Sequence, residues 1–451
     1  MMTLQFTRLL VCSIALATVP AVVRAGQAPQ DQPAPEEVRR PFRGLFGAPP
    51  DLSRRHSLIA SASLFAAYDD DVFADHGVSG DTLNPGDRRR DGIYSGATAG
   101  LAYSRRGDRV NAGLSADVGV HKYKDRDPLP GYRIGANISG SLARRTSVSV
   151  AGSAGYSPEF RLGVFTSPAS PTGFQDPFTT VLADYDVYSL AALRTSAGGG
   201  ITQTIGRRAS VTASYWLTNI DYTDDSFDYQ SHSGGLRYTQ RLTRNTGAHL
   251  GYGYATAEYS QRVELRPLNV HRIDAGIDYG RALSISRRTR VSFTTGSAII
   301  SGQGETTGRE TSDFTLYLSG AADLTHEMGR TWKALLSYRR GIDAHEGFSQ
   351  LFLSNGLSGG VSGLLSRRVS FGSGVDYVVG RVGLTGGAHY SSVSASAGVH
   401  YALSRSLALF GRYLYYKYDF DRQVAVDPRL PRSLDRQGVR VGLSTSIPVI
   451  R

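Results

Sequence analysis

The sequence predicts an all-β protein, a transmembrane antiparallel up-and-down β-barrel of about 18 strands, with about 16 as the alternative. Three observations predict it: an export signal at the N-terminus, a repeat of about forty residues with arginine at its turns, and an alternation of apolar and polar residues between those turns. We therefore divide the chain into a signal peptide (1–25), a Pro-rich periplasmic segment (26–55) and an outer-membrane β-barrel (56–451).

The N-terminus has the pattern of a secretory signal peptide. Met1–Arg8 carries positive charge, Leu9–Val23 is apolar, and Ala25 offers a small-residue cleavage site. A membrane helix is the alternative, but the apolar run is short and Pro20 interrupts it. The only cysteine, Cys12, lies in this segment, so cleavage would leave no thiol for disulfides, metal binding or catalysis.

The composition argues against a large soluble protein. The chain has 52 Gly and 25 Tyr against 17 Phe, and 40% of its residues are apolar, which is little for a large buried core. No apolar run after residue 25 is long enough for a membrane helix. Loss of Arg8 and Arg24 would leave 48 basic and 39 acidic residues, a net charge of +9. If the mature chain enters a membrane, it does so as strands.

Arginine-containing turns recur along the chain. They are SRRGDR (104–109), ARRTS (143–147), GRRAS (206–210), TRNTG (243–247), SRRTR (286–290), MGRTW (328–332), SRRVS (366–370) and SRSLA (404–408). Their starts are 39, 63, 37, 43, 42, 38 and 38 residues apart. A β-propeller blade has a similar period but needs a turn about every ten residues, whereas each repeat here holds two long uninterrupted runs. Alternate short basic turns and longer Asp-, Pro- and Gly-containing loops favour membrane hairpins.

Alternation within the runs separates two faces. From Val110 the even positions are Val, Ala, Leu, Ala, Val and Val, and the odd positions are Asn, Gly, Ser, Asp, Gly and His. A soluble sandwich also alternates, so strand length, export and aromatic placement decide. Tyr156, Tyr254, Tyr338 and Tyr377 lie about 8–11 residues from the turns, which is roughly 20–28 Å at a 40° tilt and matches an apolar band about 25 Å tall.

The strand count gives an independent check. Eight basic turns and nine outer loops connect eighteen strands and place both termini on the periplasmic side. The expected strands start near Ser57, Gly92, Arg109, Gly131, Thr146, Tyr188, Ser210, Tyr229, Thr246, Val270, Arg290, Ser312, Arg330, Gln350, Arg368, Gly386, Ser406 and Gln437. The strands over 188–205 and 210–222 have the weakest patterns, which is why sixteen strands stay open as the alternative.

Charged residues on the polar face are the candidate functional residues. Arg or Lys facing lipid at mid-membrane would cost about 2–4 kcal/mol, so these charges are expected to face a polar interior. The candidates for the pore lining are Asp117, Arg133, Arg237, Arg241, Arg272, Asp274, Asp278, Lys333, Arg339, Asp376, Arg412 and Arg440. Two interpretations stay open: structural ion pairs between neighbouring strands, or the lining of a water-filled channel in which the basic excess favours anions.

No catalytic or cofactor motif carries comparable weight. The ten histidines show no HExxH pattern, and no GxxxxGK[ST] loop occurs. Acidic outer loops such as Asp69–Asp71 could hold a divalent cation, but they are also typical of solvated loops. We expect no enzyme activity, no cofactor, no metal site and no nucleic-acid partner.

The mature chain resembles the outer-membrane β-barrel porins of Gram-negative bacteria, a group that includes barrels of exopolysaccharide secretion loci. The resemblance rests on the signal peptide, the arginine-turn repeat and the strand count. It implies the cell outer membrane, contact with lipids and lipopolysaccharide, insertion by the barrel assembly machinery, and passive passage of polar or anionic solutes or of an exported polysaccharide. Such barrels usually end on an aromatic residue, whereas this chain ends Ser446–Arg451 (SIPVIR).

Other functions stay open at this point. A closed or plugged barrel acting as a structural or adhesive surface protein is the alternative to a channel, and an outer-membrane hydrolase is a third class. Residues 27–50 could contact a periplasmic export partner, and Arg39–Phe46, which is basic and aromatic, could dock in the lumen. The solute, the oligomeric state, the openness of the lumen and the recognition of the C-terminus are not determined by the sequence.

Overall fold

The computed structural model describes most of the chain after residue 54 and one short piece before it. The described residues are 44–47, 55–70, 91–124, 127–157, 160–161, 186–188, 191–223, 228–259, 268–283, 288–302, 314–344, 351–383, 388–424 and 432–450. The regular secondary structure in these ranges is β-strand. None of their segments forms a helix long and apolar enough to cross a membrane.

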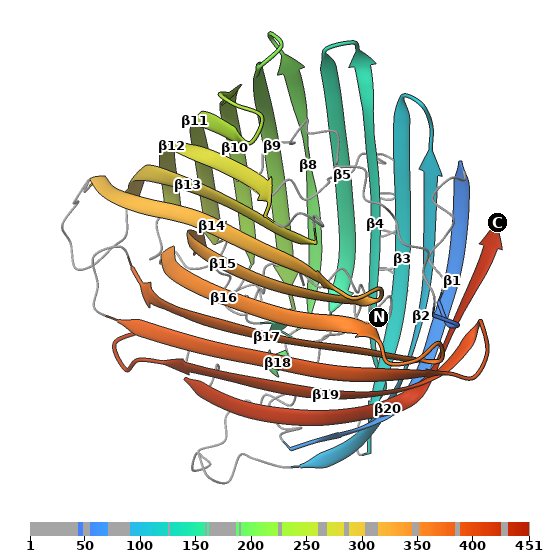
Figure 1. The fold of residues 1–451 in the computed structure, drawn as a ribbon. Coiled ribbons are helices and arrows are strands. Elements are labelled where there is room, and N and C mark those ends of the chain that lie inside the picture. The colour runs from blue at the N-terminus through green and yellow to red at the C-terminus, as the bar shows by residue number, and fades with distance from the viewer. Residues whose placement is uncertain are drawn as a thin grey trace, which may run out of the picture.

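Eighteen long strands form one antiparallel sheet (Figure 1). They are β1 (His56–Asp69), β2 (Gly92–Arg106), β3 (Val110–Tyr123), β4 (Leu129–Ala143), β5 (Thr146–Ser157), β8 (Ala192–Thr204), β9 (Ala209–Tyr222), β10 (Tyr229–Arg241), β11 (Thr246–Tyr259), β12 (Leu268–Ala282), β13 (Thr289–Gly302), β14 (Phe314–Met328), β15 (Trp332–Ala344), β16 (Leu351–Leu364), β17 (Val369–Val382), β18 (His389–Ala402), β19 (Leu407–Phe420) and β20 (Ser433–Ile450).

The sheet closes on itself because β1 pairs with both β2 and β20. Each strand in between pairs with its sequence neighbours in the sheet, so the order is that of an up-and-down barrel. The predicted fold and the count of eighteen are confirmed, and the sixteen-strand alternative is wrong because both weakly patterned strands, β8 and β9, are present. Full closure leaves no unpaired strand edge in this eighteen-stranded sheet.

Most predicted strand starts lie within three residues of the observed ones, and two are shifted by four residues. The strand expected from Tyr188 begins at Ala192, and β7 (Asp186–Tyr188) instead pairs with β6 (Phe160–Arg161) in a separate two-stranded ribbon. The last strand begins at Ser433 rather than Gln437. Aspartate and proline near these strand ends masked their alternation in the sequence.

The barrel has one rim of short arginine turns and one rim of longer connections. His56 at the start of β1 pairs with Arg105, and Leu58 pairs with Ile450 near the end of β20. Both ends of the barrel chain therefore lie at the arginine rim, where Figure 1 shows the C-terminus beside β1. At the same rim, the backbone N–H of Leu45 donates to the carbonyl oxygen of Arg367 over 2.8 Å.

The outward face of the barrel is apolar and exposed. Leu101, Leu250 and Ile273 are between 48% and 56% exposed, and they alternate with inward residues along their strands. The predicted outward tyrosines Tyr338 and Tyr377 are 41% and 44% exposed. A continuous exposed apolar surface of this kind is unfavourable in water and is typical of a surface that meets lipid. The closed, even-stranded barrel thus has the architecture of an outer-membrane β-barrel.

Candidate pore lining

The inward face is polar, and its side chains bond across neighbouring strands. Ser63 shares a hydrogen bond of 2.7 Å with Thr98, and Thr202 shares one of 3.0 Å with Thr212. Small side chains are needed where large ones meet: a Cβ on Gly442 would collide with the Phe65 side chain and the Leu64 carbonyl oxygen. The alternation of the sequence therefore separates a lipid-type exterior from a hydrogen-bonded interior.

All twelve candidate lining residues lie at the alternate strand positions whose side chains point into the barrel, which we call the inward parity. In each strand they alternate with exposed apolar residues of the outward face. The twelve are Asp117, Arg133, Arg237, Arg241, Arg272, Asp274, Asp278, Lys333, Arg339, Asp376, Arg412 and Arg440. Their exposure differs widely. The side chains of Arg133 and Arg241 are exposed, whereas Arg440 is only 8% exposed. The set is thus divided into residues that face open space and residues that are engaged in packing.

One group of these residues forms an ion-pair network on β10, β11 and β12. The Arg237 guanidinium lies 3.9 Å from Asp274 and 3.5 Å from Asp278. The His249 ring lies between the same two carboxylates, with Nε2 3.3 Å from Asp274 and Nδ1 3.1 Å from Asp278. Thr294 on β13 donates to Asp278. These residues fit the structural interpretation because both carboxylates have Arg237 and His249 as partners within the wall.

A second network lies where β1 meets β20. Arg436 donates from Nε to both carboxylate oxygens of Asp69 at 2.9 Å, and its Nη2 is 2.7 Å from Asp69 Oδ2. Both side chains are at most 4% exposed. Arg440 lies 4.1 Å from the centre of the Phe65 ring and donates to the Tyr94 hydroxyl at 3.2 Å. These contacts join the first two strands to the last one, where the barrel closes.

Inward aromatic side chains gather near the outer ends of the strands. One hydrophobic cluster holds Phe352 of β16, Tyr390 of β18, and Tyr416 and Tyr418 of β19, together with Ile220 of β9. These five side chains are at most 4% exposed. β9 lies seven strands away from β16 in the ring, so the cluster contains residues from opposite walls. The outer half of the interior is therefore narrower than eighteen strands alone would give.

Several inward polar residues are not predicted by the sequence pattern. Arg436 precedes the strand start expected at Gln437, Arg194 lies in a strand whose start was misplaced, and Asp69 was assigned to an acidic outer loop. His249 was counted among scattered histidines. The alternation around Leu250, which is 56% exposed, was a signal that its neighbour His249 points inward.

A GxSxG pattern, also overlooked, spans Gly356–Gly360 in the middle of β16. A nucleophile elbow needs a sharp strand-to-helix turn, which this continuous strand does not provide. Ser358 is 2% exposed and its register partners on β15 and β17 are Ser337 and Asp376, with no histidine in that row. Among the described residues, no group of three or more His, Cys, Asp or Glu side chains could hold a metal ion.

No protein-family model matches the chain, and no curated protein matches it. Solved structures do resemble it. Pseudomonas aeruginosa OccK11 (OpdR) is 12% identical over 88% of this chain and 96% of that one, with a TM-score of 0.42. OccK2 (OpdF) of the same organism, in complex with glucuronate, is 10% identical over 90% and 100%, with a TM-score of 0.43.

Acinetobacter baumannii OccAB4 is 11% identical over 87% of this chain and 98% of that one, with a TM-score of 0.44. The similar structures are outer-membrane porins. Identities and TM-scores this low give no information about a shared solute or mechanism, and the fold assignment rests on the strand pairing described above.

Proposed function

We propose that this protein is an outer-membrane channel through which small polar and anionic solutes pass passively, without enzymatic activity. One observation carries the proposal: charged side chains occupy the inward parity of a closed barrel whose outward face is apolar. Charges facing lipid would be unfavourable, whereas charges facing water in a confined passage influence which ions enter it.

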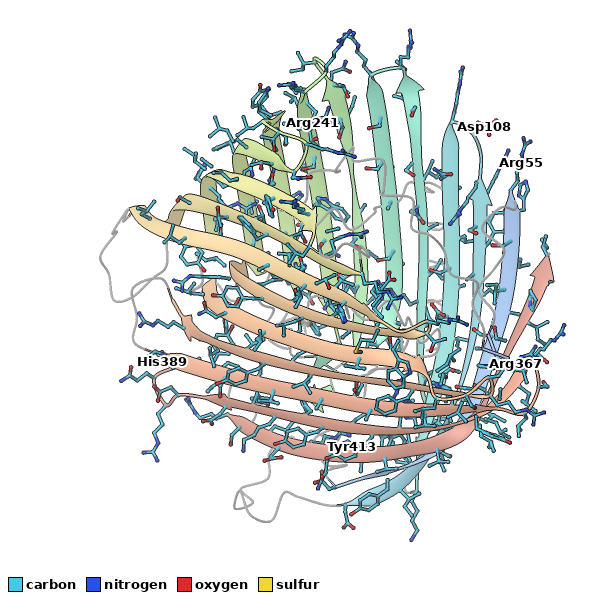
Figure 2. All side chains as sticks on the ribbon, viewed as in Figure 1. Arg55, Asp108, Arg241, Arg367, His389 and Tyr413 are labelled. Atoms are coloured by element: carbon cyan, nitrogen blue, oxygen red, sulfur yellow. The ribbon has the colours of Figure 1, made fainter. Side chains whose placement is uncertain are left out.

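The accessible basic residues support a preference for anions. The side chains of Arg133, Arg194 and Arg241 are exposed on the inward parity; Arg133 faces Asp117 as its register partner, and no ion pair with a carboxylate is recorded for Arg241 in the described part of the chain. Figure 2 shows Arg241 at the arginine rim. A ring of arginine lowers the energy of anions in the passage. Screening over about 8 Å at physiological salt keeps that preference modest.

The aromatic cluster supports small solutes rather than an exported polysaccharide. Tyr416, Tyr418 and Phe352 belong to a cluster that includes Ile220 from the opposite wall, so little width is left in the outer half of the barrel. A glycan chain would need these side chains to move apart. The expected partners, namely the assembly machinery and a periplasmic export partner at residues 27–50, remain proposals.

A plugged structural barrel is the second candidate. The same aromatic cluster favours it, as does the burial of Arg436 and Arg440, which are 3% and 8% exposed and packed on partners at the closing strands. Conductance separates the two candidates. A barrel that stays electrically silent, even after removal of residues 27–50, would be a structural protein.

The test of the channel is a charge reversal at accessible positions. Purified protein in planar bilayers should conduct, with a reversal potential in a salt gradient displaced toward the chloride value. Arg133→Glu combined with Arg241→Glu should displace it toward the cation value. The same reversal potential in both proteins would show that these residues do not line the conducting path.

A further inference from the structure

The outward face of the barrel carries an unexpected group of polar side chains at the outer ends of β15–β19. There the structure contains a hollow of about 580 Å³, which we call the outer-rim hollow. Its lining is Arg340, Leu353, Asn355, Val379, Gly380, Arg381, His389, Tyr390, Ser391, Asp419 and Asp421. Most of these residues have the outward parity, on which the rest of the barrel is apolar.

The strand register arranges the lining into two rows. The first row crosses five strands as consecutive register partners: Arg340, Asn355, Val379, Ser391 and Asp419. In the next row toward the outer rim, Arg381 pairs with Leu353 on one side and His389 on the other. Figure 2 shows His389 at the end of β18 that lies farthest from the arginine rim.

The row on the other side of the hollow marks the edge of the apolar band. It consists of Tyr338, Leu357, Tyr377, Val393 and Lys417, again as consecutive register partners. Outward tyrosines form the girdle of a membrane barrel at the level of the lipid headgroups. The outer-rim hollow begins one row beyond this girdle, so its side chains lie at the level of headgroups rather than acyl chains.

The basic part of the hollow has the chemistry of a phosphate site. Arg340 is held in place: its Nε donates to the carbonyl oxygen of Leu318 at 3.1 Å, and its Nη1 donates to Asn355 Oδ1 at 3.3 Å. Arg381 is exposed, and no ion pair to another described residue is recorded for it. Two strands and one row separate the two arginines, roughly 12 Å between their backbones, so both guanidinium groups can reach one phosphate.

The acidic residues lie on the β19 side of the hollow, where the backbone N–H of Asp421 donates to the carbonyl oxygen of His389, the register partner of Arg381. Asp419 follows two strands after Val379 in the row, and Asp421 accepts a hydrogen bond from the backbone N–H of Arg422. Lys417 one row below is paired with Asp435 at 3.1 Å. The two arginines of the hollow lie on β15 and β17, and their planar guanidinium groups match a phosphate in shape and charge.

We propose that the outer-rim hollow binds a phosphate group of a phosphorylated glycolipid in the outer leaflet, with Arg340 and Arg381 as its ligands and His389 beside them. The proposal rests on the outer-membrane location in the proposed function but not on channel activity. It gives the expected contact with lipopolysaccharide a definite place on the barrel.

The test measures lipid binding by native mass spectrometry of the purified barrel in detergent. The probes are diphosphorylated lipid A and the same lipid with its phosphates removed. We expect the phosphorylated form to bind about tenfold or more tightly than the dephosphorylated one, because each charge-assisted contact to a phosphate contributes strongly. Arg340→Gln combined with Arg381→Gln should abolish this difference, and Arg381→Gln alone should reduce it.

The matched control removes two outward arginines at the other rim. Arg105→Gln with Arg281→Gln loses the same charge from exposed outward positions and should keep the preference for phosphorylated lipid. Millimolar inorganic phosphate should not displace the lipid. Equal binding of both lipids, an unchanged preference in the Arg340 and Arg381 variants, or displacement by inorganic phosphate would overturn the proposal. Bilayer conductance of the double variant should be unchanged, which separates this test from that of the channel.

Discussion

Replacing Arg436 by alanine is expected to lower the free energy of unfolding by about 3–5 kcal/mol. Arg436 and Asp69 are paired at 2.7–2.9 Å through two guanidinium nitrogens, and both side chains are at most 4% exposed. Loss of the guanidinium leaves the Asp69 carboxylate buried without its cation. Removing both charges, with Asp69→Ala and Arg436→Leu together, should cost much less than Arg436→Ala alone, because no uncompensated charge remains.

The control for this experiment is a solvent-exposed salt bridge with a similar distance between its charged atoms. Lys417 lies 3.1 Å from Asp435 between β19 and β20, with side chains 51% and 45% exposed. Lys417→Ala should change the free energy of unfolding by about 0–1 kcal/mol, since solvent screens such pairs. The assay is reversible guanidinium unfolding of the folded barrel in lipid vesicles. Equal costs for Arg436→Ala and Lys417→Ala would refute the view that the buried pair locks β1 to β20.

Three further predictions follow from the barrel geometry. A cysteine replacing exposed Thr223 should react with an impermeant thiol reagent on whole cells, and one replacing Thr243 in an arginine turn should not. The opposite labelling pattern would mean that the arginine turns face the outside of the cell. Arg133→Glu should displace the reversal potential toward cations and lower stability by about 1 kcal/mol, since it places a second carboxylate directly opposite Asp117. Tyr416→Ala with Tyr418→Ala should raise the single-channel conductance. It should also lower the free energy of unfolding by about 3–5 kcal/mol for each buried ring. Unchanged conductance would show that solutes do not pass beside these rings.

The sequence predicted eighteen strands, with sixteen as the alternative, because each strand repeats one physical constraint and the pattern is weak only over 188–205 and 210–222. A residue such as Leu114 must face lipid and its neighbour Ser115 must not, so alternation recurs in all eighteen strands. Two strand starts differ from the prediction where local composition obscures the alternation of apolar and polar residues. Near Tyr188 and Gln437, aspartate and proline marked loops, while strand pairing set the actual starts at Ala192 and Ser433.

The candidate lining was only partly predictable for a different reason. Parity identifies which side chains point inward, but it does not say which of them meet across strands distant in sequence. Asp69 and Arg436 are 367 residues apart, and only barrel closure brings them together. The aromatic cluster around Tyr416 likewise depends on residues of opposite walls, which no local pattern records.

The outer-rim hollow shows the same limit. Arg340, Asn355 and Asp419 are separated in the sequence, and their common row follows from the register of four successive strand pairs. Once the register is known, charged residues on the lipid-facing parity are conspicuous. Their position one row beyond Tyr338 and Tyr377 then indicates the headgroup level.

The central claim is that the closed barrel conducts anions through a basic interior. The most direct measurement is the zero-current potential of the purified wild-type protein in a planar bilayer under a tenfold gradient of potassium chloride. The proposed channel should give stable conductance and a potential displaced from zero toward the chloride value. A potential displaced toward the potassium value would contradict the role of the inward arginines, and the absence of any conductance would contradict the channel itself.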